Sequence, residues 1–253
     1  MLSFIKQKIS REKNNPKRVL LVSLQKSGTH LIQNLFSRVG FQAHFNRSAG
    51  PISLRDFSSK KNTYISSHHA PMDDVQIELE KNPESMKIIF MFRDPRDVLV
   101  SWFHWVHPKN KKPQHSHMRY MQKVYKHFSD EEMIEMFIAN DKLRQQEYNV
   151  IEHFYFSRIL LFHPNVLKVR FEDLIGPRGG GEQQKQLESI KAFTQYLSIE
   201  QADIESIADS LFSEDSATFR RAMVGSYKTF LTPDQLNFFN KRHAKILSQY
   251  GYE

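Results

Sequence analysis

A short polar loop follows the first apolar run of the chain and carries groups that bind oxyanions. Residues 19–24 are mostly apolar, and Lys26, Ser27, Gly28 and Thr29 follow closely. Thr29 opens a stretch with helical spacing. The loop would therefore meet the N-terminus of a helix, where backbone N–H groups and the helix dipole favour negative charge. Gly28 would let the backbone approach an anion closely, and Lys26 could neutralise an oxygen that gains charge as a bond breaks. The sequence predicts a receptor for a phosphate or sulfate group.

The loop differs from the phosphate-binding loop of nucleoside triphosphatases. That loop has a glycine, then four residues, then a Gly-Lys-Ser/Thr triplet. Here Lys26 precedes Gly28, and the preceding strand contains no glycine. A standard ATP or GTP loop is therefore not predicted. An ordinary strand-to-helix turn with a helix cap is the plain structural alternative.

A second anion site is predicted after another apolar run. Arg93 follows the run at 87–92, and Ser101 comes eight residues after Arg93, two turns into a helical pattern. A guanidinium fork and a hydroxyl together suit a phosphate monoester. Asp97 is expected to cap the helix or to pair with a cation, and not to act on a substrate.

These polar groups need a scaffold that brings them together. Strand and helix patterns alternate along the chain, which predicts an α/β fold with a central parallel sheet flanked by helices. Ligands of such sheets bind beyond the carboxyl ends of the strands, so the polar groups are expected to converge there. Strands are expected at 19–24, 41–45, 64–67, 87–92 and 166–171. Helices are expected at 29–39, 73–81, 98–106, 130–160, 182–196, 199–211 and 232–250, with loops at 107–119 and 177–181.

Composition narrows the class of protein. The 253 residues fit one globular domain at 18–253, preceded by a flexible arm at 1–17. The net charge of +8 favours anionic partners. With no cysteine, the chain cannot form disulfides, thiolate zinc sites or a cysteine nucleophile. No segment is long and apolar enough for a membrane span, and a cytoplasmic location is expected. The histidines between 104 and 127 form no tight ligand set, so no metal site is expected.

The polar groups, taken in order, resemble the motifs of the sulfotransferases that use 3′-phosphoadenosine 5′-phosphosulfate (PAPS), especially the cytosolic type. Four segments carry the resemblance: Gln25–His30, Arg93–Asp97 with Ser101, Phe171–Leu174, and Arg220–Gly225. Together they extend over residues 19–228. Their common order is more specific than any one of them. The chain departs from the family at Phe171, where a Tyr is usual, and at His30-Leu31, where an adenine-stacking aromatic is usual.

The resemblance implies the P-loop-like sulfotransferase fold and PAPS as co-substrate, with no metal required. It assigns five residues to the 5′-phosphosulfate: Lys26, Ser27, Gly28, Thr29 and His30. It assigns four to the 3′-phosphate: Arg93, Ser101, Arg220 and Arg221. Lys26 would also stabilise the bridging oxygen as the sulfuryl group departs.

The resemblance further implies a histidine as general base. His69 stands in a His-x-Pro setting, His69-Ala70-Pro71, that matches the family, and its neighbour His68 is the competitor. The acceptor would be a hydroxyl or amine on a small molecule, lipid or sugar. No nucleic-acid partner is expected, and the oligomeric state is open.

Two other functions are compatible with the residues. A nucleotide-dependent small-molecule kinase would need Mg²⁺ and a glycine upstream of Lys26. A non-catalytic module that binds anions or nucleic acid would use the net charge of +8, although no aromatic-basic recognition motif stands out.

Overall fold

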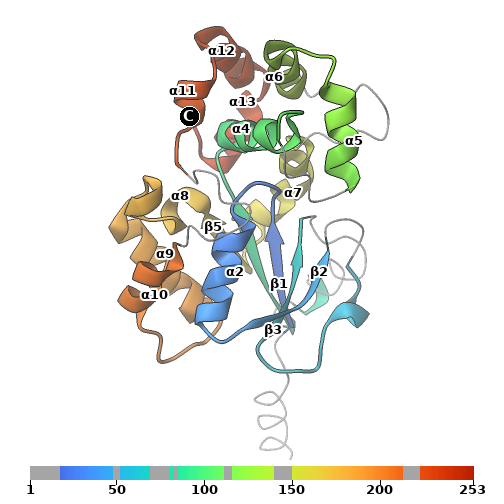
Figure 1. The fold of residues 1–253 in the computed structure, drawn as a ribbon. Helices are drawn as coiled ribbons and strands as arrows, with labels where there is room; N and C mark the ends of the chain where they lie inside the picture. The colour runs from blue at the N-terminus through green and yellow to red at the C-terminus, as the bar shows by residue number, and fades with distance from the viewer. Residues whose placement is uncertain are drawn as a thin grey trace, which may run out of the picture.

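A parallel sheet forms the centre of the described structure, with helices around it (Figure 1). The computed structural model describes residues 18–47, 52–68, 80–82, 85–110, 116–139, 150–212 and 223–253. The strands are β1 (Arg18–Ser23), β2 (Gln42–Arg47), β3 (Thr63–Ser67), β4 (Met86–Phe92) and β5 (Val166–Arg170).

All pairings between these strands are parallel, and the order is β2-β3-β1-β4-β5. β1 forms the longest register, from Arg18 opposite Met86 to Ser23 opposite Met91. The chain builds β2 and β3 on one side of β1 and then crosses to β4 and β5 on the other. The loop after β1 thus leaves the sheet where the strand order reverses, the place where such sheets bind ligands.

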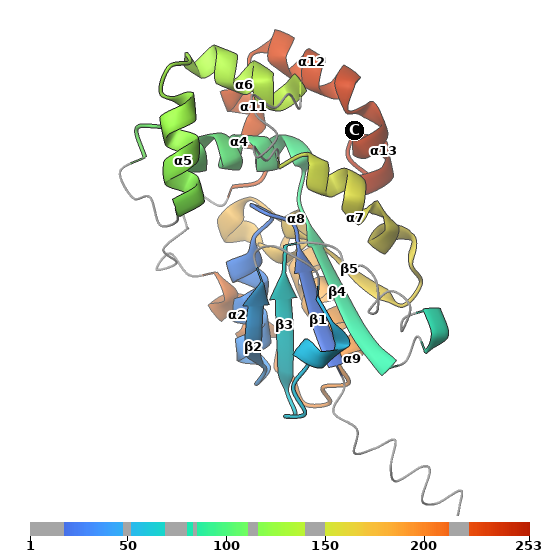
Figure 2. The same ribbon diagram turned by 90° about the vertical axis from the view of Figure 1, so that its right-hand side faces the viewer.

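Helices surround the sheet. The α-helices of the first part are α2 (Thr29–Arg38), α4 (Pro95–Val106), α5 (Ser116–Tyr125), α6 (Asp130–Ala139) and α7 (Glu152–Phe162). Those of the second part are α8 (Phe171–Leu174), α9 (Gln183–Tyr196), α10 (Ile204–Leu211), α11 (Tyr227–Phe230), α12 (Pro233–Arg242) and α13 (Ala244–Tyr250). Two short 3₁₀ helices are η1 (Leu54–Asp56) and η3 (Pro177–Gly179). Figures 1 and 2 show α2, α9 and α10 at one face of the sheet, and α4, α5, α6, α12 and α13 gathered beyond the tips of the strands.

Each face of the sheet has its own core, because successive side chains of a strand point to opposite faces. On β1, Val19 and Leu21 belong to the cluster that includes α2, α9 and α10. Leu20 and Val22 belong to the cluster formed with α4, α6, α7, α12 and α13. β1 is therefore covered on both faces, as the unbroken apolar run at 19–22 requires.

The α/β class and all five strands were predicted, with ends that differ by a few residues. Four loop or helix predictions were wrong, and the fourth concerns the segment at 177–181. The structure has α5 from Ser116, within the predicted loop at 107–119. The predicted helix at 232–250 is two helices joined at His243, whose ring is buried and whose Nε2 donates to Ile138 O at 2.6 Å. The predicted helix at 199–211 begins only at Ile204, where Asp203 caps it.

The segment predicted as a flexible connection at 177–181 is instead a packed turn. Residues 177–179 form η3, and Gly179 is buried. A Cβ added at Gly181 would lie 2.5 Å from Glu172 O, so the chain passes directly against α8 there. Phe171 was predicted as the end of the last strand and is instead the first residue of α8. Most of the predicted helix at 73–81 lies outside the described residues.

Candidate active site

The loop between β1 and α2 contains two residues with positive φ angles. Lys26 has φ = 65° and Gly28 has φ = 93°, both in the left-handed region. Backbones that enter this region at nearby residues turn their N–H groups toward a common point, which makes a concave site for an anion. The Thr29 hydroxyl lies 2.8 Å from that of Ser23, so the start of α2 is tied to the end of β1.

Ser27 gives the clearest sign of a ligand. Its side chain is fully buried, and among the described residues its Oγ has no hydrogen-bond partner. A buried hydroxyl without a partner costs free energy, about 1–3 kcal/mol. A ligand oxygen in the loop would supply the missing bond, so the residues present fit an oxyanion.

Phe171 joins the loop to the second predicted anion site. A Cβ added at Gly28 would lie 2.5 Å from Phe171 Cδ2, so the ring packs directly on the glycine. The same ring lies under the Arg93 guanidinium, 4.3 Å from the ring centroid. The family's usual Tyr would offer a hydroxyl here, whereas Phe171 offers only a ring that spaces Gly28 and Arg93.

Replacing Gly28 by Ala should therefore destabilise the protein strongly. The positive φ costs about 1 kcal/mol for a residue with a Cβ, and the contact with Phe171 adds about 1–3 kcal/mol. For a chain of this size we expect the melting temperature to fall by about 6–12 °C. Gly40→Ala is the matched control, because Gly40 has φ = 80° and no atom within 4 Å of an added Cβ. An equal loss for both variants, measured by thermal unfolding, would contradict the packing role of Gly28.

Lys26 is a buried cation that faces another cation. Burial and, next, the Arg93 guanidinium lower the pKa of Lys26 to about 8. The Nζ atom lies over the Trp105 ring, 5.3 Å from its centroid. Trp105 lies in the last part of α4, so its contact brings the end of this helix to the loop after β1. Partial burial and the Lys26 charge lower the pKa of His30, which therefore favours the neutral imidazole.

Arg93 is held by a buried carboxylate. Its Nη2 donates to Met223 O at 2.7 Å and to Asp97 Oδ2 at 3.3 Å, while its Nε has no partner among the described residues. Asp97 also accepts hydrogen bonds from Gly225 N at 2.8 Å, Ser226 Oγ at 2.8 Å and Tyr227 N at 3.0 Å. The prediction that Asp97 pairs with a cation is confirmed. The helix cap is Asp94, which accepts from Arg96 N.

Asp97→Asn should loosen this second site. The amide has one acceptor oxygen in place of two, and it leaves the buried Arg93 charge without its counter-ion. Breaking a buried pair costs about 3–5 kcal/mol, so we expect the melting temperature to fall by about 6–15 °C. Ser226→Ala is the control, since it removes one donor and should cost about 1 kcal/mol. If urea unfolding shows that both variants lose a similar free energy of unfolding, Asp97 contributes no more than the acceptor of a single hydrogen bond.

Glu172 binds the backbone of the turn that follows Arg93. Its carboxylate accepts from Asp94 N and from Tyr252 Oη, both at 2.8 Å. Burial is the main influence on Glu172 and raises its pKa, although these hydrogen bonds act in the opposite direction. Glu172 thus joins the turn after β4 to the C-terminal segment of the chain.

The described histidine of the pair, His68, lies at the site. Its Nδ1 lies 2.8 Å from Ser23 O, and since a carbonyl only accepts, Nδ1 carries the proton. The Nδ1 atom of His153 in turn donates to His68 O at 3.1 Å. His69, Arg220 and Arg221 lie outside the described residues. Ser101 is half-buried on α4.

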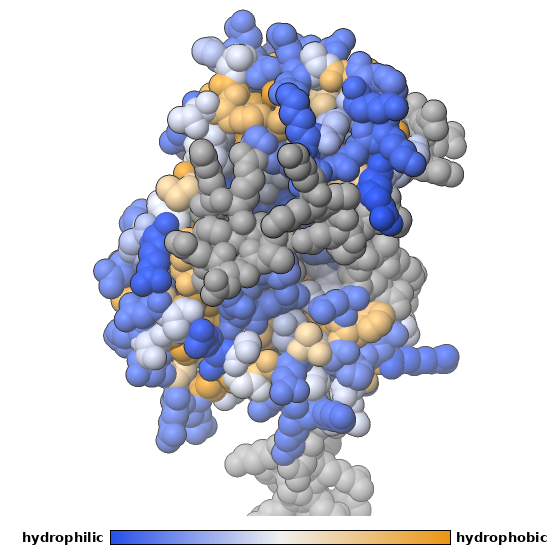
Figure 3. All heavy atoms as spheres, in the orientation of Figure 1, coloured by the Kyte–Doolittle hydropathy of each residue, from blue (hydrophilic) through white to orange (hydrophobic). Residues whose placement is uncertain are grey.

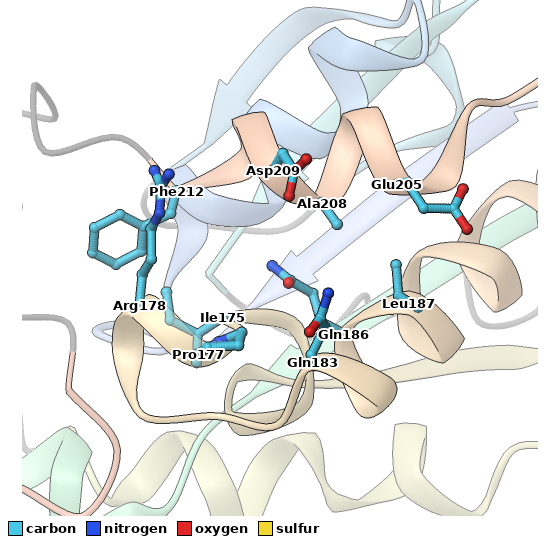
Figure 4. A pocket seen from close by; sticks show the side chains of 10 residues that line it. All are labelled: Ile175, Pro177, Arg178, Gln183, Gln186, Leu187, Glu205, Ala208, Asp209 and Phe212. Carbon is cyan, nitrogen blue, oxygen red and sulfur yellow. The ribbon is translucent and has the colours of Figure 1, made fainter.

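A separate cavity of about 290 Å³ lies between η3, α9 and α10. Figure 4 shows Arg178 and Phe212 together at one end of it and Glu205 and Leu187 at the other. None of the predicted site residues lines this cavity. Within the described part of the chain, no group of three or more potential metal ligands comes together. Within the same part, no helix has the length and apolar character to cross a bilayer.

Comparisons with known proteins agree with this geometry. The sulfotransferase domain model matches residues 16–251. An amine sulfotransferase of Oryctolagus cuniculus is 28% identical over 99 residues, which cover 34% of this chain and 32% of the relative. The chain thus matches about a third of the length of that curated relative.

Solved structures share the fold. A mouse sulfotransferase in complex with PAP, the desulfated donor, has a TM-score of 0.61 at 21% identity, over 91% of this chain and 84% of its own. Retinol dehydratase in complex with androsterone and PAP has a TM-score of 0.60 at 15% identity, over 92% and 81% of the two chains. With the family model spanning nearly the whole chain, this protein belongs to the sulfotransferase domain family.

Proposed function

We propose that this protein transfers a sulfuryl group from PAPS to an acceptor hydroxyl or amine by in-line displacement, with a histidine as general base. One observation carries the proposal: the buried Ser27 hydroxyl finds no hydrogen-bond partner in the described part of the chain, beside a lysine whose pKa is lowered to about 8. An oxyanion in the loop would give the Ser27 hydroxyl a hydrogen-bond acceptor and the Lys26 ammonium an opposite charge. Family membership and the PAP complexes of the structural neighbours favour PAPS as the source of that oxyanion.

The loop residues would bind the 5′-phosphosulfate. Five residues lie around the N-terminus of α2, where hydroxyls and N–H groups can donate hydrogen bonds: Lys26, Ser27, Gly28, Thr29 and His30. As the bond to the bridging oxygen breaks, Lys26 would stabilise the charge that develops there. Binding PAPS would also raise the pKa of Lys26 by placing anionic oxygens near its ammonium.

The second site would bind the 3′-phosphate. Arg93, anchored by Asp97, would offer its Nε, which has no partner within the described ranges, and Ser101 would add a hydroxyl. Arg220 and Arg221 are proposed to complete this site. Binding energy from this remote phosphate would hold the reacting sulfur in line with the acceptor.

The proton of the acceptor would pass to His69 as its oxygen or nitrogen attacks sulfur. His68 is the alternative base, since a proton on Nδ1 leaves Nε2 as the basic nitrogen. The proposed acceptor class is a broad one, drawn from two similar proteins. One is an amine sulfotransferase, and the other was crystallised with androsterone. A small hydroxyl- or amine-bearing molecule, lipid or sugar is proposed.

Calorimetry with PAP, ATP and a short oligonucleotide would test the function. We expect PAP to bind much more tightly than the other two, without added Mg²⁺. We also expect Ser27→Ala to lose about tenfold in PAP affinity, the equivalent of one hydrogen bond. Tight binding of ATP alone would support a kinase, and tight binding of the oligonucleotide alone would support a nucleic-acid module. Either result would overturn the sulfotransferase proposal.

A further inference from the structure

Helix α7 exposes a large apolar face to solvent. Four side chains form it, with exposed fractions of 37% for Tyr155, 64% for Phe156, 48% for Ile159 and 65% for Phe162. Tyr155, Ile159 and Phe162 follow helical spacing, so they lie in one stripe, and Phe156 lies beside it. These four residues are called the α7 patch below.

The patch is distinct from the packing face of the helix. The buried residues of α7 are His153, Phe154, Ser157 and Leu160, which lie on the opposite side. Large apolar side chains therefore lie on both sides of the helix, although only one side is packed against the protein. Figure 2 shows α7 below α13, on the side of the molecule turned away from the face seen in Figure 3. On the face in Figure 3, hydrophilic side chains cover most of the surface outside the grey atoms. Grouped aromatic side chains at a surface indicate an interaction site.

Exposed cations lie on α7 and on the segments that contact it. Arg158 lies on the helix itself, and the Arg242 charge acts on the Tyr155 hydroxyl. Lys168 donates from Nζ to His163 O, 2.7 Å away, at the carboxyl end of α7. Lys245 is exposed on α13, which packs against α7. Glu152, in the first turn, is the acidic residue of the helix. An apolar surface with cations near it is complementary to an apolar phase with an anionic boundary.

We propose that the α7 patch docks the protein on an anionic lipid membrane. At about 1.5 Å per residue, the 11 residues of α7 extend about 16 Å. The helix would therefore lie in the plane of the interface and not span the bilayer. Phe156, Ile159 and Phe162 enter the boundary between headgroups and acyl chains, and Tyr155 keeps its hydroxyl among polar atoms. Arg158, Lys168, Arg242 and Lys245 reach the anionic headgroups.

Vesicle flotation of the whole protein tests the proposal. The probes are vesicles of phosphatidylcholine alone and vesicles with about one third phosphatidylserine. We expect binding to the anionic vesicles, weakened when NaCl is raised from about 0.1 M to about 0.5 M. The double variant Phe156→Ser/Phe162→Ser should bind at least ~10-fold more weakly. Arg158→Gln/Lys245→Gln should also weaken binding by about tenfold and reduce its salt dependence.

Phe45→Ser is the matched control. Phe45 is 41% exposed and lies on β2, at the far edge of the sheet from β5. The Phe45→Ser variant should bind vesicles as the unmodified protein does. Circular dichroism should show that all variants are folded. Absence of binding by the unmodified protein, or equal binding by the Phe156/Phe162 variant, would overturn the proposal. So would a dimer in sedimentation velocity that the double variant dissociates while vesicles are not bound, since the patch would then join two copies of this chain.

Discussion

His69→Ala is expected to abolish sulfuryl transfer while leaving the affinity for PAP nearly unchanged. A general base contributes about 10²–10⁴-fold to the rate, because it removes a proton as the acceptor attacks. The imidazole is not among the groups proposed to hold either phosphate of the donor. The loss should thus fall on kcat, measured with radiolabelled PAPS and an acceptor found by screening, while calorimetry with PAP gives an affinity close to that of the unmodified protein.

His68→Ala is the natural comparison for this variant. Because His68 donates from Nδ1 to Ser23 O at the end of β1, its loss should loosen the loop beside Ser23 and Thr29. We expect a smaller loss of turnover for His68→Ala, accompanied by weaker PAP binding. The opposite pattern, with full loss of turnover only in His68→Ala, would make His68 the base. Equal loss of PAP binding and turnover in His69→Ala would remove His69 from the proton transfer.

The sequence predicted the sheet well because its signals are local. The apolar runs that became β1 and β4 are covered on both faces, and each is followed by polar groups that cannot continue a strand. The helix ends were harder to predict. The break between α12 and α13 depends on the buried His243 ring, which donates to Ile138 O on α6, far away in the sequence. No local pattern at 232–250 encodes that contact.

The candidate site also has residues that a local sequence pattern predicts and contacts that form only after folding. Lys26, Ser27 and Gly28 could be found because loop type, glycine and the following helix are adjacent in the chain. The ring of Phe171 between Gly28 and Arg93 could not, because three separate segments meet there only after folding. The Trp105 ring beneath Lys26 is a second such case. Helical spacing on α4 predicts that Trp105 is near the core, but not which loop lies over it.

Lys26→Met should remove most transfer activity and at the same time stabilise the empty protein. Loss of the charge at the developing oxyanion should lower kcat by about 10²–10³-fold. The stability gain follows from the pKa of Lys26, lowered to about 8 by burial and by Arg93. The unfolded chain binds this proton with the ordinary lysine pKa. Below pH 8 the folded protein must therefore keep an ammonium in a place that disfavours it. Met has a similar volume without the charge, so we expect a gain of about 2 kcal/mol at pH 7 and a melting temperature higher by about 4–8 °C.

The pH dependence separates this electrostatic cause from a general effect of an apolar substitution. Between pH 8 and the ordinary lysine pKa, the unfolded state binds more protons than the folded state, so the unmodified protein gains stability as pH rises. The advantage of Lys26→Met should therefore shrink across that range. Lys60→Met, at an exposed loop position, should show neither the gain nor its pH dependence. If the stability gained by Lys26→Met stays constant from pH 7 to pH 10, the charge of Lys26 is not the cause of that gain. If the pattern holds, Lys26 is kept in a costly charged state because its bound partner is an anion, and saturating PAP should then stabilise the unmodified protein more than the variant.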